Sequence, residues 1–235
     1  MPPPEFVKLA EENGLIDPLT DLILRQAIDA ARRWPNDVRV SVNVSPVQLN
    51  SELVDRVREV IKKSEFDPGR LELEVTEDVL INDFEQAASV LARLRSLGIQ
   101  VAMDDFGAGY TSLGNLRRLN FDRIKIDRIF TMDLPNHRRS AAIVRSVFVL
   151  ARELDLDVTV EGVETQEQFA FLRAEGCAEV QGFLFSQPKP LSAFIDPACL
   201  QLALPAIKPA QPAAVPASPS AALIEISERR AKRAS

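Results

Sequence analysis

The chain has 235 residues, 46% of them hydrophobic and 26% charged, which is an ordinary globular balance and excludes a wholly disordered protein. With 34 acidic residues against 28 Lys and Arg residues the net charge is −6, so we expect no DNA or RNA polymer as a partner. Two cysteines are too few for a disulfide framework, and we find neither an apolar run of membrane-spanning length nor a signal peptide, so we expect a cytoplasmic chain without a membrane span.

Six β-rich runs alternate with amphipathic helical patterns. The predicted strands are residues 38–44, 71–76, 99–105, 123–127, 158–163 and 179–185. Apolar stripes with helical spacing predict helices near residues 19–34, 53–61, 84–97, 143–154 and 169–176. Because a helix between two strands returns the chain to the same end of the sheet, this order predicts parallel strands and an α/β fold.

We assign residues 1–203 to one folded domain. Residues 204–222 are rich in proline and alanine and cannot bury enough side chain to offset the entropy of ordering, so they are predicted to form a linker. Residues 223–235 end in a basic cluster and are predicted to be a solvated tail. A helix that docks on a partner or on an anionic surface is the alternative for this tail.

Within each predicted strand, aliphatic side chains fall on one face and at least one polar side chain falls on the other. Glu72 and Glu179 share the polar face but lie farther from the strand ends, so we leave them out of the candidate site. The polar residues towards the carboxyl ends are Asn43, Glu74, Asp104, Lys125 and Glu161, while Gln181 lies nearer the middle of its run.

Two arrangements accommodate such a polar face. One is an antiparallel sheet with a solvated face. The other is a (β/α) barrel, in which polar groups at the carboxyl ends of the strands converge on the place where barrel active sites lie. The helical crossovers favour the barrel. Since a closed barrel of this kind has eight strands, we predict a TIM-barrel-like fold that is incomplete, with about six of the eight strands present.

The converging residues include several acids, which would repel one another unless a cation neutralised them. Oxygen ligands without His or Cys favour Mg²⁺, Mn²⁺ or Ca²⁺. The adjacent Asp104 and Asp105 can serve two metal ions about 4 Å apart, an arrangement used for the hydrolysis of phosphate esters. Lys125 on the same face can steady an attacking hydroxide or a phosphate oxygen.

Seven motifs follow one another in the first 183 residues. They are FVKLAEENGLI (6–16), SVNVS (41–45), EVTE (74–77), DDFGAGYTSL (104–113), KID (125–127), EGVET (161–165) and QGF (181–183). In this order and spacing the chain closely resembles the EAL-domain phosphodiesterases, from about residue 3 to residue 200. The resemblance implies hydrolysis of cyclic di-GMP to linear pGpG with two Mg²⁺ or Mn²⁺ ions, and a homodimer that uses the helix near residues 141–154.

The resemblance also implies roles for individual residues. Lys125 would orient the nucleophilic water, and Glu164 and Gln181 would support the network of metal and water. Glu77 would hold the loop after Asp105, which couples the site to dimerisation in this family. The implied metal ligands are Asn43, Glu74, Asp104, Asp105 and Glu161.

Two departures from the family pattern stand out. Ala108 and Thr111 replace the usual Thr and Ser of the loop after Asp105, which is expected to affect the order of the loop rather than the supply of ligands. The Glu-Ala-Leu signature and the two strands expected upstream of residue 6 are absent from the sequence, and the missing glutamate is a metal ligand in the family. We therefore expect a truncated or degenerate domain with one weakened metal site and low activity.

Two other functions are considered. A cyclic di-GMP receptor or protein-interaction module without catalysis would bind the dinucleotide and leave it intact. An unrelated metal-dependent barrel acting on a carboxylate substrate would not bind cyclic dinucleotides.

Overall fold

The structure is a computed structural model that describes residues 1–77, 84–108, 116 and 118–194. The predicted linker (204–222), the predicted tail (223–235) and the last residues of the predicted domain (195–203) lie outside the described residues.

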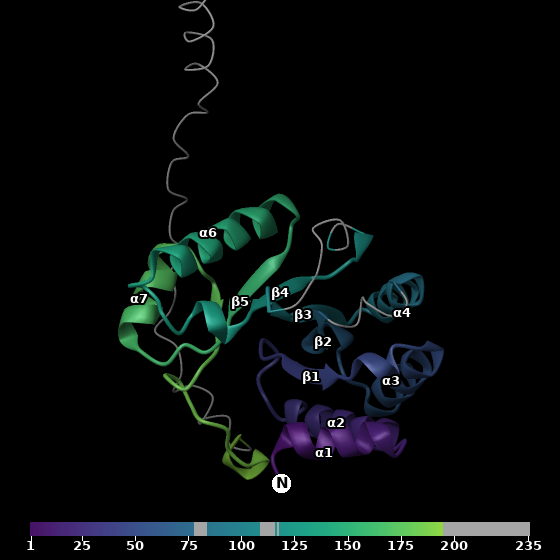
Figure 1. Cartoon of the computed structure of the whole chain (residues 1–235). Helices are drawn as coiled ribbons and strands as arrows, with labels where there is room; N and C mark the ends of the chain where they lie inside the picture. Colours follow the sequence, from purple (N-terminus) through teal and green to yellow (C-terminus); the bar gives the residue numbers. More distant parts are fainter. Residues whose placement is uncertain (78–83, 109–115, 117, 195–235) are drawn as a thin grey trace, which may run out of the picture.

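The described residues form one parallel sheet whose strands follow one another in chain order. The sheet curls into a half-barrel with the helices on its outer side (Figure 1), so the predicted α/β class with TIM-barrel-like architecture is confirmed. The strands are β1 (Val40–Val44), β2 (Leu71–Thr76), β3 (Gln100–Phe106), β4 (Arg123–Ile126), β5 (Asp157–Val160) and β6 (Glu179–Val180).

The helices occupy the predicted positions between the strands. Among the described residues they are α1 (Pro3–Glu12), α2 (Ile16–Ala31), α3 (Ser51–Ser64), α4 (Phe84–Ser96), α6 (Arg138–Glu153) and α7 (Gln166–Ala174), with short 3₁₀ turns η1 (Pro46–Gln48), η2 (Pro68–Arg70), η4 (Arg128–Phe130) and η5 (Leu191–Phe194). Only α1 was not predicted as a helix from the sequence. It begins beside Pro2 and Pro3, a position that proline favours because the first helical N–H groups need no partner within the helix.

Local sequence sets the helix boundaries. The side chain of Asn50 accepts a hydrogen bond from Leu53 N (3.1 Å) and so caps α3. Thr165 and Gln168 form a capping box at the start of α7.

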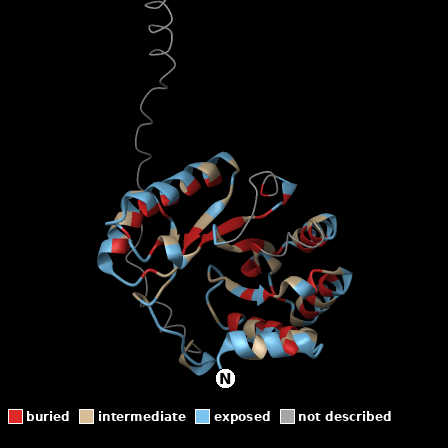
Figure 2. Cartoon of the chain, in the orientation of Figure 1, coloured by how far each residue is buried: buried red, intermediate tan, exposed pale blue. Residues whose placement is uncertain are grey.

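The core lies between the outer face of the sheet and the helices. Figure 2 shows buried residues on the strands and on the helix faces turned towards them. Leu71 and Leu73 of β2 and Ile124 of β4 are fully buried, together with Leu53 of α3 and Leu94 of α4. Burial of the aliphatic side chains therefore turns one face of each strand towards the helices. The opposite, polar face is thereby turned towards the inside of the half-barrel.

The last two strands are shorter than predicted. β5 ends at Val160, and Gly162 follows in the left-handed region with φ of 67°. β6 ends at Val180. Two residues later, Gly182 lies so close to Val163 that a Cβ atom would come within 2.1 Å of the Val163 carbonyl oxygen. Gln181 therefore directly follows the carboxyl end of its strand, and the prediction that placed it near the middle is wrong.

Within the part of the chain that the structure describes, no helix is both long and apolar enough to cross a membrane.

Candidate metal centre

Asp104 and Asp105 are neighbours on β3, and an irregularity of that strand brings their carboxylates together. The register between β3 and β4 shifts between Met103 and Phe106, and Asp105 has a φ of 55°. In a regular strand, neighbouring side chains would point to opposite faces of the sheet. A bulge with one residue in the left-handed region changes this, and both carboxylates now lie on the inner side.

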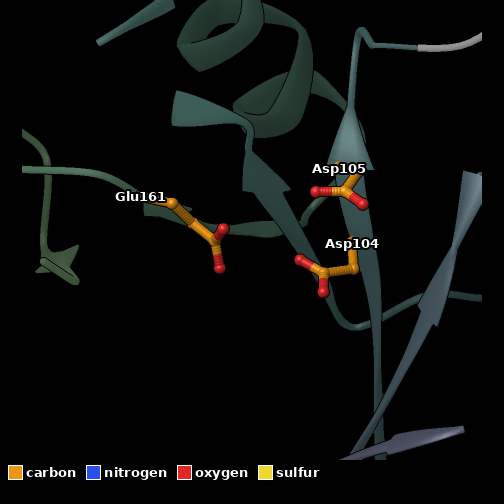
Figure 3. A group of neighbouring side chains, drawn as sticks. All are labelled: Asp104, Asp105 and Glu161. Atoms are coloured by element: carbon orange, nitrogen blue, oxygen red, sulfur yellow. The ribbon is translucent and has the colours of Figure 1, made fainter. Parts of the chain in front are cut away.

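Glu161 completes a group of three carboxylates. It follows β5, and one oxygen atom from each of Asp104, Asp105 and Glu161 lies within 4.8 Å of the others. Figure 3 shows the three side chains reaching from two elements into a common space. This is the only group of at least three such ligands found among residues 1–77, 84–108, 116 and 118–194.

Lys125 of β4 lies at the base of this group. Its Nζ atom is 2.7 Å from Glu74 Oε2, 3.0 Å from Asp104 Oδ1 and 2.6 Å from Glu161 Oε1. The lysine is only 3% exposed, so these ion pairs are shielded from solvent. The ammonium thereby draws carboxylates from β2, β3 and the loop after β5 to one point.

Burial raises the pKa of two carboxyl groups at this site. Burial, followed by the charge of Asp104 and a hydrogen bond with Asp127, raises the pKa of Asp105 to about 6. Burial also raises the pKa of Glu74, against the lowering effect of Lys125. Burial lowers the pKa of Lys125, but Glu74, Asp104 and Glu161 together outweigh burial and raise it, so the lysine is charged at neutral pH.

The donor set fits a divalent cation. Asp104 Oδ1 is buried and has no hydrogen-bond partner among the described residues, because its contact with Lys125 has the distance but not the direction of a hydrogen bond. The Lys125 ammonium already lies beside that oxygen, so the case for a metal rests on the kind and number of donors that converge here. Carboxylate oxygens without His or Cys are the ligands that Mg²⁺, Mn²⁺ and Ca²⁺ prefer.

Glu77 holds the loop that follows Asp105. Its Oε2 accepts a hydrogen bond from Gly107 N at 3.1 Å. Gly107 has a φ of 91°, and a Cβ atom there would lie 2.7 Å from the ring of Phe130. The carboxylate and the glycine thus fix the backbone two residues after Asp105. The continuation of this loop at Ala108 is described, whereas Tyr110 and Thr111 lie outside the described residues.

The remaining predicted site residues lie at or after the carboxyl ends of β1, β5 and β6. Asn43 pairs in register with Glu74, and its side chain is exposed. Glu164 is exposed, and its backbone N–H donates to Gln168 Oε1 at 2.7 Å. Gln181 lines a cavity of about 350 Å³ together with Glu74 and Lys125.

Two residues near this group were not among the predicted site residues. Asp127, the last residue of the KID motif, is one of them. It contacts Asp105 and caps η4 by accepting a hydrogen bond from Ile129 N at 2.7 Å. Arg123, two residues before Lys125, was not selected at all, although the same alternation that selected Lys125 places it on the inner face.

Comparison with known proteins assigns the chain to a family. The EAL domain family model matches residues 1–188. The chain belongs to the EAL domain family. The family model covers all seven motifs that carried the resemblance in the sequence.

Individual EAL proteins are similar over most of the chain. The cyclic di-GMP phosphodiesterase NbdA of Pseudomonas aeruginosa is 45% identical over 196 residues, which are 81% of this chain and 25% of NbdA. The chain spans about a quarter of the length of the first curated relatives it matches.

Solved EAL structures share the fold. The PaMucR phosphodiesterase in complex with c-di-GMP is 38% identical with a TM-score of 0.76, covering 81% of this chain and 79% of that chain. The manganese and cyclic di-GMP complex of Klebsiella pneumoniae BlrP1 is 35% identical with a TM-score of 0.66, covering 72% of this chain and 44% of that chain.

Proposed function

We propose that the chain is a phosphodiesterase domain that hydrolyses cyclic di-GMP to linear pGpG in bacterial second-messenger signalling. One observation carries the proposal: in a member of the EAL family, the carboxylates of Asp104, Asp105 and Glu161 lie within 4.8 Å of one another. The names of NbdA and PaMucR support the same reaction and substrate.

Asp104, Asp105 and Glu161, with Glu74 and Asn43 beside them, would hold two Mg²⁺ or Mn²⁺ ions. Bound divalent ions supply Lewis acidity towards the phosphodiester and lower the pKa of a bound water. The manganese in the BlrP1 complex is consistent with this choice of metal. The donors come from separate elements, so the curl of the sheet decides whether they converge.

The other residues of the site would orient the attacking water and hold the loop after Asp105. The charged Lys125, buried among three carboxylates, would orient the attacking water by donating a hydrogen bond to it. Glu164 and Gln181 would extend the polar network around that water. Glu77 would keep the loop after Asp105 in place through Gly107.

The assembly and location of the domain belong to the same proposal. We place it in the cytoplasm as a homodimer that uses α6, on which Ile143 and Val149 are 40% and 60% exposed. The net charge of −6 disfavours a nucleic acid polymer as a partner.

The test is incubation of the purified chain with cyclic di-GMP and Mn²⁺, followed by chromatography of the nucleotides. The proposal predicts pGpG in amounts that rise with time, and no product with EDTA or with the Asp104→Asn variant. If the chain binds cyclic di-GMP but leaves it intact, it is a receptor. If it neither binds nor cleaves the dinucleotide, the proposed substrate is wrong.

A further inference from the structure

A second group of polar side chains lies inside the half-barrel, nearer to the amino ends of the strands than the candidate metal centre. We name it the inner polar layer. It consists of residues that hydrogen bonds and ion pairs join into one network, namely Arg39, Ser41, Glu72, Gln100, Arg123, Asp157, Thr159 and Glu179.

Arg123 of β4 is the centre of this layer. Its Nε donates to Glu72 Oε2 at 2.8 Å, and its Nη1 is 2.7 Å from Glu179 Oε2. The residue is 2% exposed, and a planar guanidinium has five donors in a fixed geometry. Ala102 of β3, fully buried and in register with Arg123, is small enough to let the side chain cross β3 towards β2. One side chain thus links β2, β4 and β6.

Arg39 connects the two ends of the sheet. It directly precedes β1, and its Nη2 pairs with Glu179 of β6, although β1 and β6 are the first and last strands in the sheet order. Its Nη1 donates to Gln100 Oε1 of β3 at 2.8 Å. The contact spans the inside of the curl, so it fixes how far the sheet closes.

The layer is in register with the candidate site. A strand advances about 3.3 Å per residue, and side chains two residues apart share a face. Five members of the layer each lie two residues before a candidate site residue, in the pairs Ser41 and Asn43, Glu72 and Glu74, Arg123 and Lys125, Thr159 and Glu161, and Glu179 and Gln181. A change in the distance between strands at the layer residue therefore also moves the candidate site residue two positions later.

We infer that the inner polar layer positions the metal ligands. Arg39 and Arg123 are positioning residues that act through strand spacing and through Glu72 and Glu179. Their hydrogen bonds and ion pairs go to other members of the layer. The inference rests on the proposed function in that the acids above the layer bind a divalent cation. It adds two arginines and two glutamates to the residues on which that binding depends.

The experiment compares Arg39→Met with Arg145→Met. Arg145 of α6 pairs with Glu175 at 2.6 Å on the outer surface, so its variant also removes an ion pair but leaves the layer intact. The first readout is hydrogen exchange of the backbone amides of Glu161 and Gln181, which requires no metal. The second is the dissociation constant of Mn²⁺ measured by calorimetry.

The inference predicts that Arg39→Met speeds amide exchange at Glu161 and Gln181 and weakens Mn²⁺ binding by up to about tenfold, the lower end of the loss seen when a direct partner of a metal ligand is removed. Arg145→Met should change neither. Arg39→Lys, which keeps the charge beside Glu179, should recover part of the Mn²⁺ affinity. If Arg39→Met does not fold, Glu179→Gln removes the shared acid and is measured in the same way.

Equal exchange and equal Mn²⁺ affinity in the wild type and in the Arg39→Met chain would overturn the inference. A wild-type chain that does not bind Mn²⁺ at all would instead contradict the proposed function. In that case the exchange rates at Glu161 and Gln181 still decide whether the layer positions these residues.

Discussion

At the scale of single residues, the site depends on departures from regular strand geometry. Alternation predicts that Asp104 faces inwards but would turn Asp105 outwards. Only the shifted register of β3 and the positive φ of Asp105 bring both carboxylates to one side. Sequence alternation gives no sign of such a bulge. The adjacency of the two acids suggested that Asp105 could share a metal site with Asp104, and the family resemblance implied the same role, but neither predicted how the strand achieves it.

The loop after Asp105 supplies a prediction at this scale. Gly107→Ala would place a methyl group against Phe130 at a φ of 91° and should lower the free energy of unfolding by about 1–3 kcal/mol. The measurement is urea denaturation followed by circular dichroism. Gly69→Ala is the matched control, because Gly69 lies outside the positive-φ region and its new Cβ would meet only Asp67 Oδ1, at 3.4 Å. Equal losses in the two variants would show that Gly107 is not under conformational constraint.

At the scale of elements, α7 fixes the segment that carries Glu161 and Glu164. Thr165 Oγ1 accepts a hydrogen bond from Gln168 N at 3.2 Å, while Gln168 Oε1 accepts from the backbone N–H groups of Glu164 and Thr165. Gln168 Nε2 also donates to Thr131 O at 3.0 Å. The start of the helix therefore holds the end of the loop after β5.

Thr165→Ala removes the cap of α7 and should lower the free energy of unfolding by about 1 kcal/mol. It should also speed hydrogen exchange at Glu164 N, because the capping box no longer fixes Gln168. Thr165→Ser keeps the hydroxyl group and should behave as the wild type in both measurements. A Thr165→Ala chain with unchanged stability and exchange would contradict this role of the capping box.

Apolar spacing was sufficient to predict the helices that cover the sheet, because their buried stripes, such as Leu53, Val54 and Val57 in α3, repeat with the helical period. The β-rich run at residues 179–185 did not predict that β6 ends at Val180, nor that Gly182 beyond it lies against the Val163 backbone. That contact joins segments separated in the chain and has no local signal.

At the scale of the whole molecule, the curl of the sheet brings polar residues from separate strands together at the candidate metal centre. Alternation correctly placed Glu74, Asp104 and Lys125 on the inner face, and their ion pairs lie where the strands converge. It excluded Glu72 and Glu179 because they lie farther from the strand ends. Alternation gives the face of each residue but not the distance between strands, and Arg123 and Arg39 set that distance by contacts across the half-barrel.

The central claim is that Asp104, Asp105 and Glu161 bind divalent cations. Its most direct test is calorimetric titration of Mn²⁺ into the wild-type chain, the Asp104→Asn chain and the Asp55→Asn chain, in which the changed residue is a surface acid paired with Arg58. We predict saturable binding in the wild type and in Asp55→Asn, and its loss in Asp104→Asn. No saturable binding in the wild type, or equal binding in all three chains, would contradict the account.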